Sequence, residues 1–336
     1  MKKFSAMLLA LTLSFNVMEA SAAEVLGSGK DYFLTLAACP ASSALYPFWV
    51  AVGDILNTAI SNVHMTVSES QGAVAITKRV RSGECEMGNS VSAQDYESYN
   101  GIGTFKDSAD PKLRMLWYYE TTWEIPCVDA KQGVTDITQL NGRRFNPGGT
   151  GTSAEAIMKG IASTLGFEPN WFTASQSDAA DAYANREIIG TIKLGPAVDS
   201  YVMQLNAAIP IDLISLTDEQ VKTVIAKYPY LISGVIPSGT YTGVNHDTQV
   251  VGTPQGCQIR VDNFTQEEEY QIFKAVMETH ADIWKAAYPV GANNDIIDLT
   301  LKSSVPLAAG TVQYLVEHGY TVPEKLIPPE YVPVSK

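Results

Sequence analysis

The sequence predicts an α/β protein with two lobes joined by two strands. Short apolar strands alternate with amphipathic helices from residue 33 onward, an order typical of a parallel sheet covered by helices. The pattern completes one α/β unit near residue 128, builds a second, and returns to the first near residue 252. With 336 residues, 46% of them hydrophobic, the chain is long enough to form two cores.

The first unit follows the order β-α-β-α-β with short links. Its elements are strands at 33–39, 64–69 and 85–90 and helices at 46–60 and 73–82. Helical spacing of apolar residues identifies the helices, and short apolar runs bounded by turn residues identify the strands. A long apolar and aromatic stretch at 113–128 then leaves this unit. Its cluster of Trp117, Tyr118, Tyr119 and Trp123 is expected to form core or hinge packing.

The second unit begins after a turn-rich segment at 133–142. We expect strands at 144–146, 188–194 and 211–216, with helices at 153–165 and 218–227. The strand at 250–261 returns to the first unit, and Thr265 with Glu268 forms a capping box that opens a helix to about residue 287. Two further helices are expected near 295–302 and 309–318.

These elements predict the domain organisation. Lobe I comprises 23–128 and 252–300, lobe II comprises 129–251, and the C-terminal helix and tail at 301–336 are left without a lobe. Ligands of such proteins usually bind in the cleft between the lobes.

The first 22 residues have the features of a cleaved signal peptide. Lys2 and Lys3 precede an apolar stretch at 6–17, and Ala20-Ser21-Ala22 supplies a small-x-small cleavage site. The stretch is too short for a membrane anchor, and no later segment has eighteen uninterrupted apolar residues. We therefore expect an exported, periplasmic protein cleaved near Ala22, without stable membrane insertion.

Charge and composition exclude several classes of partner. The formal net charge is −13, so phosphate backbones and anionic membranes would repel the protein, and nucleic-acid binding is not expected. The four histidines are scattered without metal-ligand spacing. We expect no metal, no cofactor and a monomer.

Export into an oxidising compartment raises the question of disulfides. Cys39 and Cys85 lie about 13 Å apart along neighbouring parallel strands, too far for a bridge. Cys127 and Cys257 lie in the two segments expected to cross between the lobes. A Cys127–Cys257 disulfide is therefore the expected pairing, with four buried thiols as the alternative.

The glycine-rich run from Gly148 to Ser153 lies between a short strand and a helix. Thr152 and Glu155 form a capping box, which places the helix N-terminus in this loop. Free N–H groups and hydroxyls there would bind a carboxylate or another small anion. The run also matches a dinucleotide fingerprint, but an exported protein has little access to NAD; a plain tight turn is the remaining alternative.

Other loops after strands of the parallel sheets are rich in hydroxyl, amide or glycine residues. Since such loops face the ligand cleft, several supply candidate contacts. The candidate ligand-binding residues are Ser42, Ser43, Tyr46, Ser70, Gln71, Asn89, Ser90, Gly149, Thr150, Gly151, Thr152, Ser153 and Gly195. The chain contains neither G-x-S-x-G nor H-E-x-x-H, and we expect no enzymatic activity.

Six short motifs occur in the same order as in one family of exported binding proteins. They are Leu45-Tyr46-Pro47, Gln71-Gly72-Ala73-Val74 followed by Ser82-Gly83-Glu84, Leu140-Asn141-Gly142-Arg143-Arg144, Gly149-Thr150-Gly151-Thr152, Gly195-Pro196, and the segment from Pro306 to Gly319. Together they resemble the TAXI family, the solute-binding proteins of one branch of TRAP transporters. The resemblance covers nearly all of the chain after the signal peptide.

The resemblance implies a type II periplasmic binding-protein fold with two parallel-core sheets and a two-strand hinge. It implies capture of a small organic acid or amino acid, such as glutamate or 2-oxoglutarate, and delivery to a sodium-coupled TRAP permease. Hinge closure of the lobes would bury the ligand. A ligand-presenting component for a sensor kinase is the alternative, which a neighbouring transporter gene would disfavour. A periplasmic enzyme is the third reading.

The chain departs from the family pattern in its first loop. Residues 38–45 lack the family's glycines and second tyrosine, Ala73 replaces the serine of the Gly-Ser-Val stretch, and Trp49 stands where a small residue is usual. We therefore expect a pocket that is narrower on one side, and glutamate should not be assumed as the ligand.

Overall fold

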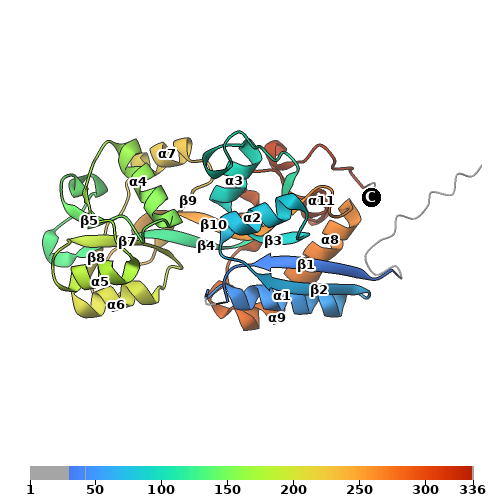
Figure 1. Cartoon of the computed structure of the whole chain (residues 1–336), viewed down its shortest axis with the longest axis horizontal. Helices are drawn as coiled ribbons and strands as arrows, with labels where there is room; N and C mark the ends of the chain where they lie inside the picture. The colour runs from blue at the N-terminus through green and yellow to red at the C-terminus, as the bar shows by residue number, and fades with distance from the viewer. Residues whose placement is uncertain (1–29, 42, 335–336) are drawn as a thin grey trace, which may run out of the picture.

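The protein has two lobes that share one continuous sheet (Figure 1). A computed structural model describes residues 30–41 and 43–334. The predicted signal peptide and Ser42 lie outside the described residues. Two long strands run through both lobes, β4 (Leu113–Asp129) and β10 (Thr248–Arg260). We call the end of the sheet that holds β1 lobe I and the end that holds β7 lobe II.

Lobe I has three parallel strands next to β10. β1 lies between β2 and β3, and β3 pairs antiparallel with β10. Its C-terminal helix lies against α8, and Leu307 bridges to Met115 of β4, so the C-terminal segment belongs to this lobe. The elements are β1 (Tyr32–Ala38), α1 (Tyr46–Ala59), β2 (Val63–Glu69), α2 (Ala73–Ser82), β3 (Met87–Val91), α3 (Ser92–Asn100), α8 (Gln266–Lys274), α9 (Ala281–Ala287), α10 (Ile296–Leu301) and α11 (Ala309–Glu317).

Lobe II continues the sheet from β4. β7 pairs with β4 and with β5, and β8 pairs with the same end of β4. The elements are β5 (Arg144–Asn146), α4 (Ser153–Leu165), β6 (Asn170–Trp171), α5 (Gln176–Ala184), β7 (Gly190–Gly195), α6 (Ser200–Ala208), β8 (Ile211–Leu213), α7 (Asp218–Lys227) and β9 (Ile232–Ile236). Separate apolar clusters fill the two faces of this part of the sheet.

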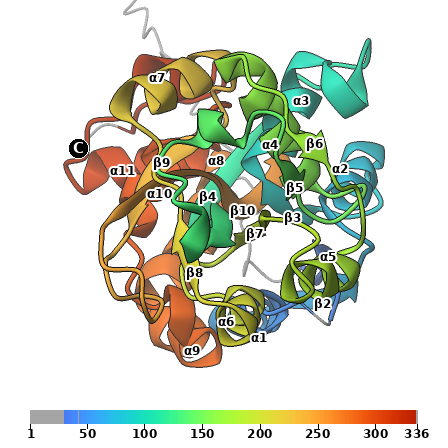
Figure 2. The ribbon, with the colours of Figure 1, turned by 90° about the vertical axis from the view of Figure 1, so that its left-hand side faces the viewer.

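The two-lobed α/β architecture confirms the predicted fold class, with one difference in the sheets. The sequence predicted two sheets, whereas backbone hydrogen bonds join all ten strands into one curled, mixed sheet. The sheets merge because β4 and β10 are each long enough to pair with strands of both lobes. Figures 1 and 2 show α5 and α6 of lobe II opposite α1 of lobe I, and α4 on the side of α2 and α3.

The expected helix from Thr265 to about residue 287 is interrupted. The capping box of Thr265 and Glu268 is present, but the helix passes into a π-helical turn at Ala275–Thr279 before α9 begins. The His280 N–H donates to the Ala275 carbonyl, which closes this wider turn. Four elements, α3, α5, α6 and β9, were not predicted. Their apolar residues are too few, or their segments too short, to show a helical or strand periodicity.

The predicted Cys127–Cys257 disulfide is wrong. Both residues do lie on the crossing strands, but Cys257 is opposite Trp117, ten residues from Cys127 along β4. Ten strand residues span about 33 Å, whereas a disulfide joins Cα atoms less than about 7 Å apart. All four cysteines are buried free thiols.

Candidate functional site

The carboxyl ends of strands from both lobes converge on the middle of β4. β3 ends at Val91, opposite Gln255 of β10, which in turn lies opposite Glu120. β7 ends at Gly195, opposite Trp123. Glu120 and Trp123 are three residues apart, about 10 Å along the strand. The loops that follow these strands therefore meet over the crossing strands, which is where open α/β sheets bind ligands.

At the end of β3, Asn89 and Ser90 are buried within lobe I. The Asn89 amide donates to the carbonyls of Ser90 and Gly256, and the Ser90 hydroxyl lies 3.8 Å from the sulfur of Met115. These two candidates join β3 to the crossing strands and have at most 4% of their surface exposed. The Asn89 amide N–H groups and the Ser90 hydroxyl therefore already have partners inside the protein.

The loops after β1 and β2 place the other lobe I candidates. Arg79 donates to the Ser70 hydroxyl, so this group is also engaged, while Gln71 is exposed. Ser43 accepts from the Leu45 N–H in the turn before α1, and Tyr46 is the half-buried first residue of that helix. Ser43, Tyr46 and Gln71 are thus the lobe I candidates at helix starts that remain partly accessible.

The glycine-rich loop of lobe II uses most of its own N–H groups. Thr152 caps α4 by accepting from the Glu155 N–H, and its hydroxyl donates to the Gly149 carbonyl. The Glu155 carboxylate accepts from the Gly151 N–H at 2.6 Å, not from Thr152 as a regular capping box would require. Thr150 donates to the carbonyl of Ala174. Of the candidates here, the Gly149 N–H, Ser153 and the Thr150 hydroxyl keep groups with no hydrogen bond to another described residue.

Glu155 also places a negative charge at the start of α4. Its hydrogen bonds with Lys159 and with the Gly151 N–H lower the pKa of the carboxyl, so it is ionised at neutral pH. An anion approaching this helix N-terminus would meet an existing carboxylate.

The end of β7 adds a cation that the sequence analysis missed. Lys193 is half-buried two residues before Gly195, and its Nζ atom lies 3.4 Å from the Gln176 side-chain oxygen at the start of α5. A methyl group on Gly195 would lie 2.4 Å from a carboxylate oxygen of Asp199 and 3.3 Å from Lys193 Cε. The sequence did offer a signal for this cation, because Lys193 interrupts the otherwise uncharged strand segment Thr191–Leu194.

The middle of β4, residues 120–123, lies between the lobes, and we call this segment the floor. The indole ring of Trp123 lies against Gly234 of β9 and Gly252 of β10, where any Cβ would collide with it. The Thr121 hydroxyl is buried with no hydrogen-bond partner among the described residues. Ser92 of α3 donates to the Tyr230 carbonyl, which ties the two lobes together beside this floor.

Two buried acids flank the floor. Burial raises the pKa of Asp95 to about 7, although its bonds with Tyr118 and Ser90 oppose the shift. Burial also raises the pKa of Glu124 well above its usual value, and Lys193 opposes this shift electrostatically. Both oxygens of Glu124 lack a hydrogen-bond partner among the residues described. These environments favour the neutral acids.

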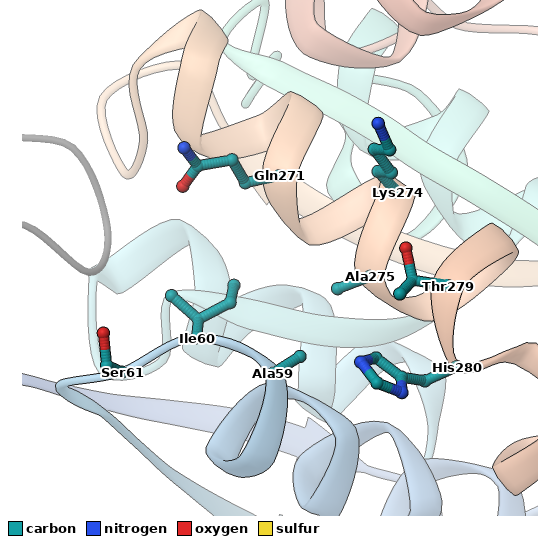
Figure 3. A pocket seen from close by; sticks show the side chains of 8 residues that line it. All are labelled: Ala59, Ile60, Ser61, Gln271, Lys274, Ala275, Thr279 and His280. Atoms are coloured by element: carbon teal, nitrogen blue, oxygen red, sulfur yellow. The ribbon is translucent and has the colours of Figure 1, made fainter.

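Two cavities of the described region bear on the choice of site. One of about 270 Å³ lies between β9 and α10 and is lined by Glu120, Thr121 and Trp123, so it adjoins the same floor. A cavity of about 410 Å³ lies wholly within lobe I, between the end of α1 and the π-helical turn (Figure 3). Figure 3 shows the His280 ring directed toward Ala59 and Lys274 directed away from Ser61. This second cavity includes no strand end.

Neither metal nor membrane features stand out in the part of the chain that the structure describes. Its His, Cys, Asp and Glu residues form no group of three placed to hold a metal ion. No helix among those residues combines the length and hydropathy needed to span a membrane.

A model of the NMT1-like family matches residues 36–319. The chain belongs to the NMT1-like family. Its relatives of this family and fold are solute-binding proteins rather than enzymes. The match covers both lobes and both crossing strands, whereas membership of the TAXI family stays a prediction from the motifs.

Solved structures share the fold at low sequence identity. The periplasmic sulfonate-binding protein SsuA from Methylobacillus flagellatus KT is 12% identical, with a TM-score of 0.50 over 90% of this chain and 92% of that one. A TctC solute-binding protein from Polaromonas is 11% identical, with a TM-score of 0.51 over 80% of this chain and 89% of that one. These similarities establish the two-lobed solute-binding fold.

Proposed function

We propose that the protein is an exported solute-binding protein that captures a small organic acid between its lobes and delivers it to a TRAP-type, sodium-coupled permease. Membership of the NMT1-like family carries the binding function. The signal-like sequence at 1–22 supports export to the periplasm. The six TAXI-like motifs support a TRAP permease as the partner.

The proposed ligand lies over the middle of β4. The ends of β3 and β7 lie opposite this part of β4, which supports the position. We expect a ligand there to contact Tyr46 and Gln71 of lobe I and Ser153 of lobe II. Closing the lobes on it would remove the acid from water and strengthen each polar contact. The closed form would present a surface to the permease that the open form lacks.

A thermal-shift screen tests the function directly. Protein refolded to remove co-purified ligand is screened against carboxylates, amino acids, alkanesulfonates and neutral sugars. A ligand at 1,000 times its Kd adds about 4 kcal/mol, enough to raise the melting temperature by several degrees. We expect acids to produce such a shift and neutral sugars to produce none. Refolded protein that no acid stabilises would contradict the proposal.

A further inference from the structure

Lys193 is a cation at a strand end without an anionic partner. It lies opposite Ile125 on the face of the sheet covered by α5 and α6. No carboxylate of the described residues comes within 4 Å of its Nζ atom, and the only hydrogen bond recorded for it is the 3.4 Å contact to Gln176. Because a partly buried charge loses hydration, such a group is usually paired, and the pairing is missing here.

Gln176 connects this cation to the glycine-rich loop. It is the first residue of α5, and a methyl group on Gly149 would lie 3.4 Å from its Cγ atom. The Tyr201 hydroxyl donates to the Gln176 carbonyl, which fixes the start of α5 against α6. Gln176 therefore lies between Lys193 and the glycine-rich loop that the sequence predicted to bind an anion.

Two acids lie near Lys193, but neither forms an ion pair with it within 4 Å. Asp199 accepts the N–H groups of Tyr201 and Val202 and so caps α6. Glu124 interacts electrostatically with Lys193, but it lies opposite Leu194 on the neighbouring strand, so its side chain leaves the other face of the sheet, and burial favours its neutral form. The negative charge of Glu155 is directed to Lys159 and the Gly151 N–H.

We infer that Lys193 and Gln176 form the subsite for the anionic group of the ligand, a carboxylate or sulfonate. The ammonium group of Lys193 supplies the charge, and the Gln176 amide supplies a second donor. The subsite rests on the proposed function, since it needs an organic acid between the lobes. Recognition of the anion then depends on a lysine of β7 more than on the N-terminus of α4.

Titration calorimetry with the best acid from the screen tests this subsite. Lys193→Met keeps the length of the side chain and removes its charge. Because hydrogen bonds to charged groups are the strong ones, we expect the Kd to rise at least tenfold. Lys159→Met is the matched control, because this lysine lies in the same lobe but is paired with Glu155. Its Kd should stay within about twofold of the wild type.

Two further variants keep the test decisive if Lys193→Met fails to fold. Lys193→Arg preserves the charge and should bind within about fivefold of the wild type, because a guanidinium also pairs with carboxylates. Gln176→Glu places a carboxylate beside Lys193 and should weaken binding as strongly as Lys193→Met does. Raising the salt concentration should weaken binding by the wild type more than by Gln176→Glu.

The outcomes separate the subsite from the function. If the wild type binds an acid and Lys193→Met or Gln176→Glu binds it equally well, the subsite is wrong and the proposed function stands. If the refolded wild type binds no acid, both are overturned. A large loss of affinity in Lys159→Met would indicate that the anion binds at the start of α4 instead.

Discussion

The two lobes differ in how the polar groups at their strand ends are used. In lobe I, Asn89, Ser90 and Ser70 are buried and already hydrogen-bonded to their own lobe. In lobe II, Lys193 is half-buried and has no carboxylate partner among the described residues. These strand-end groups of lobe I are therefore satisfied within the fold, whereas the strand end of β7 keeps a charge without a carboxylate partner among the described residues.

This difference shows that residue type alone does not identify a binding group. Serine and asparagine at strand ends join elements when their partners lie inside the fold, as the Asn89 amide does. A cation with no internal partner must find one in solvent or in a ligand. We therefore expect the strand ends of lobe I to be rigid and those of lobe II to be adaptable.

The largest expected effect comes from one added methyl group between the two crossing strands. In Gly256→Ala, the new Cβ would lie 2.0 Å from the backbone oxygen of Trp117, so the crossing strands must move apart. We expect a loss of about 3 kcal/mol in the free energy of unfolding, measured by urea denaturation.

Gly195→Ala is the matched change in lobe II. Its Cβ would meet the ends of the Asp199 and Lys193 side chains, which can move. We expect a loss of about 1 kcal/mol or less. Equal losses in the two variants would contradict the contrast between a rigid lobe I and an adaptable lobe II.

The next effect concerns the pH dependence of stability in lobe I. Burial raises the pKa of Asp95 to about 7, above the value of about 3.9 in an unfolded chain. The folded protein then binds more protons than the unfolded chain between these values. The contribution of Asp95 is therefore complete below pH 4 and is lost as the pH rises through 7. We expect the wild type to lose about 3 kcal/mol on this account between pH 5 and pH 8.

Asp95→Asn removes this titration. Urea unfolding at pH 5 and pH 8 should show a smaller difference in the variant than in the wild type. Glu269, whose pKa burial also raises to about 7, and the buried Glu120 and Glu124, whose pKa values burial raises as well, should contribute to the dependence that remains. A variant with an unchanged pH dependence would show that Asp95 does not titrate in this range.

The smallest expected effect concerns the start of α4. Thr152→Val removes the cap that accepts the Glu155 N–H, which should cost about 1 kcal/mol of stability. Because the Thr152 hydroxyl is engaged within its loop, we expect the Kd for an acid to change less than in Lys193→Met. Calorimetry on both variants checks the order. A larger loss of affinity in Thr152→Val than in Lys193→Met would support the sequence-based prediction that the glycine-rich loop binds the anion.

Local signals in the sequence were sufficient for several elements. The helices at Ala73–Ser82, Ser153–Leu165 and Asp218–Lys227 begin and end where their apolar spacing predicted. Thr152 and Thr265 cap helices as expected, because a cap depends only on residues three positions apart. The two crossing strands were also visible, since long apolar runs do not depend on their partners.

The sequence by itself determined the two-lobed α/β class, the crossing segments and most helix starts, because each follows from neighbours in the chain. Only the tertiary structure decided the register of β10 on β4, which separates Cys127 from Cys257. It also decided which polar groups are satisfied. The Gly151 N–H donates to Glu155, whereas Lys193 forms no ion pair with a carboxylate in the described part of the chain. Hydrogen-bond partners and register depend on residues far apart in sequence, and no local pattern encodes them.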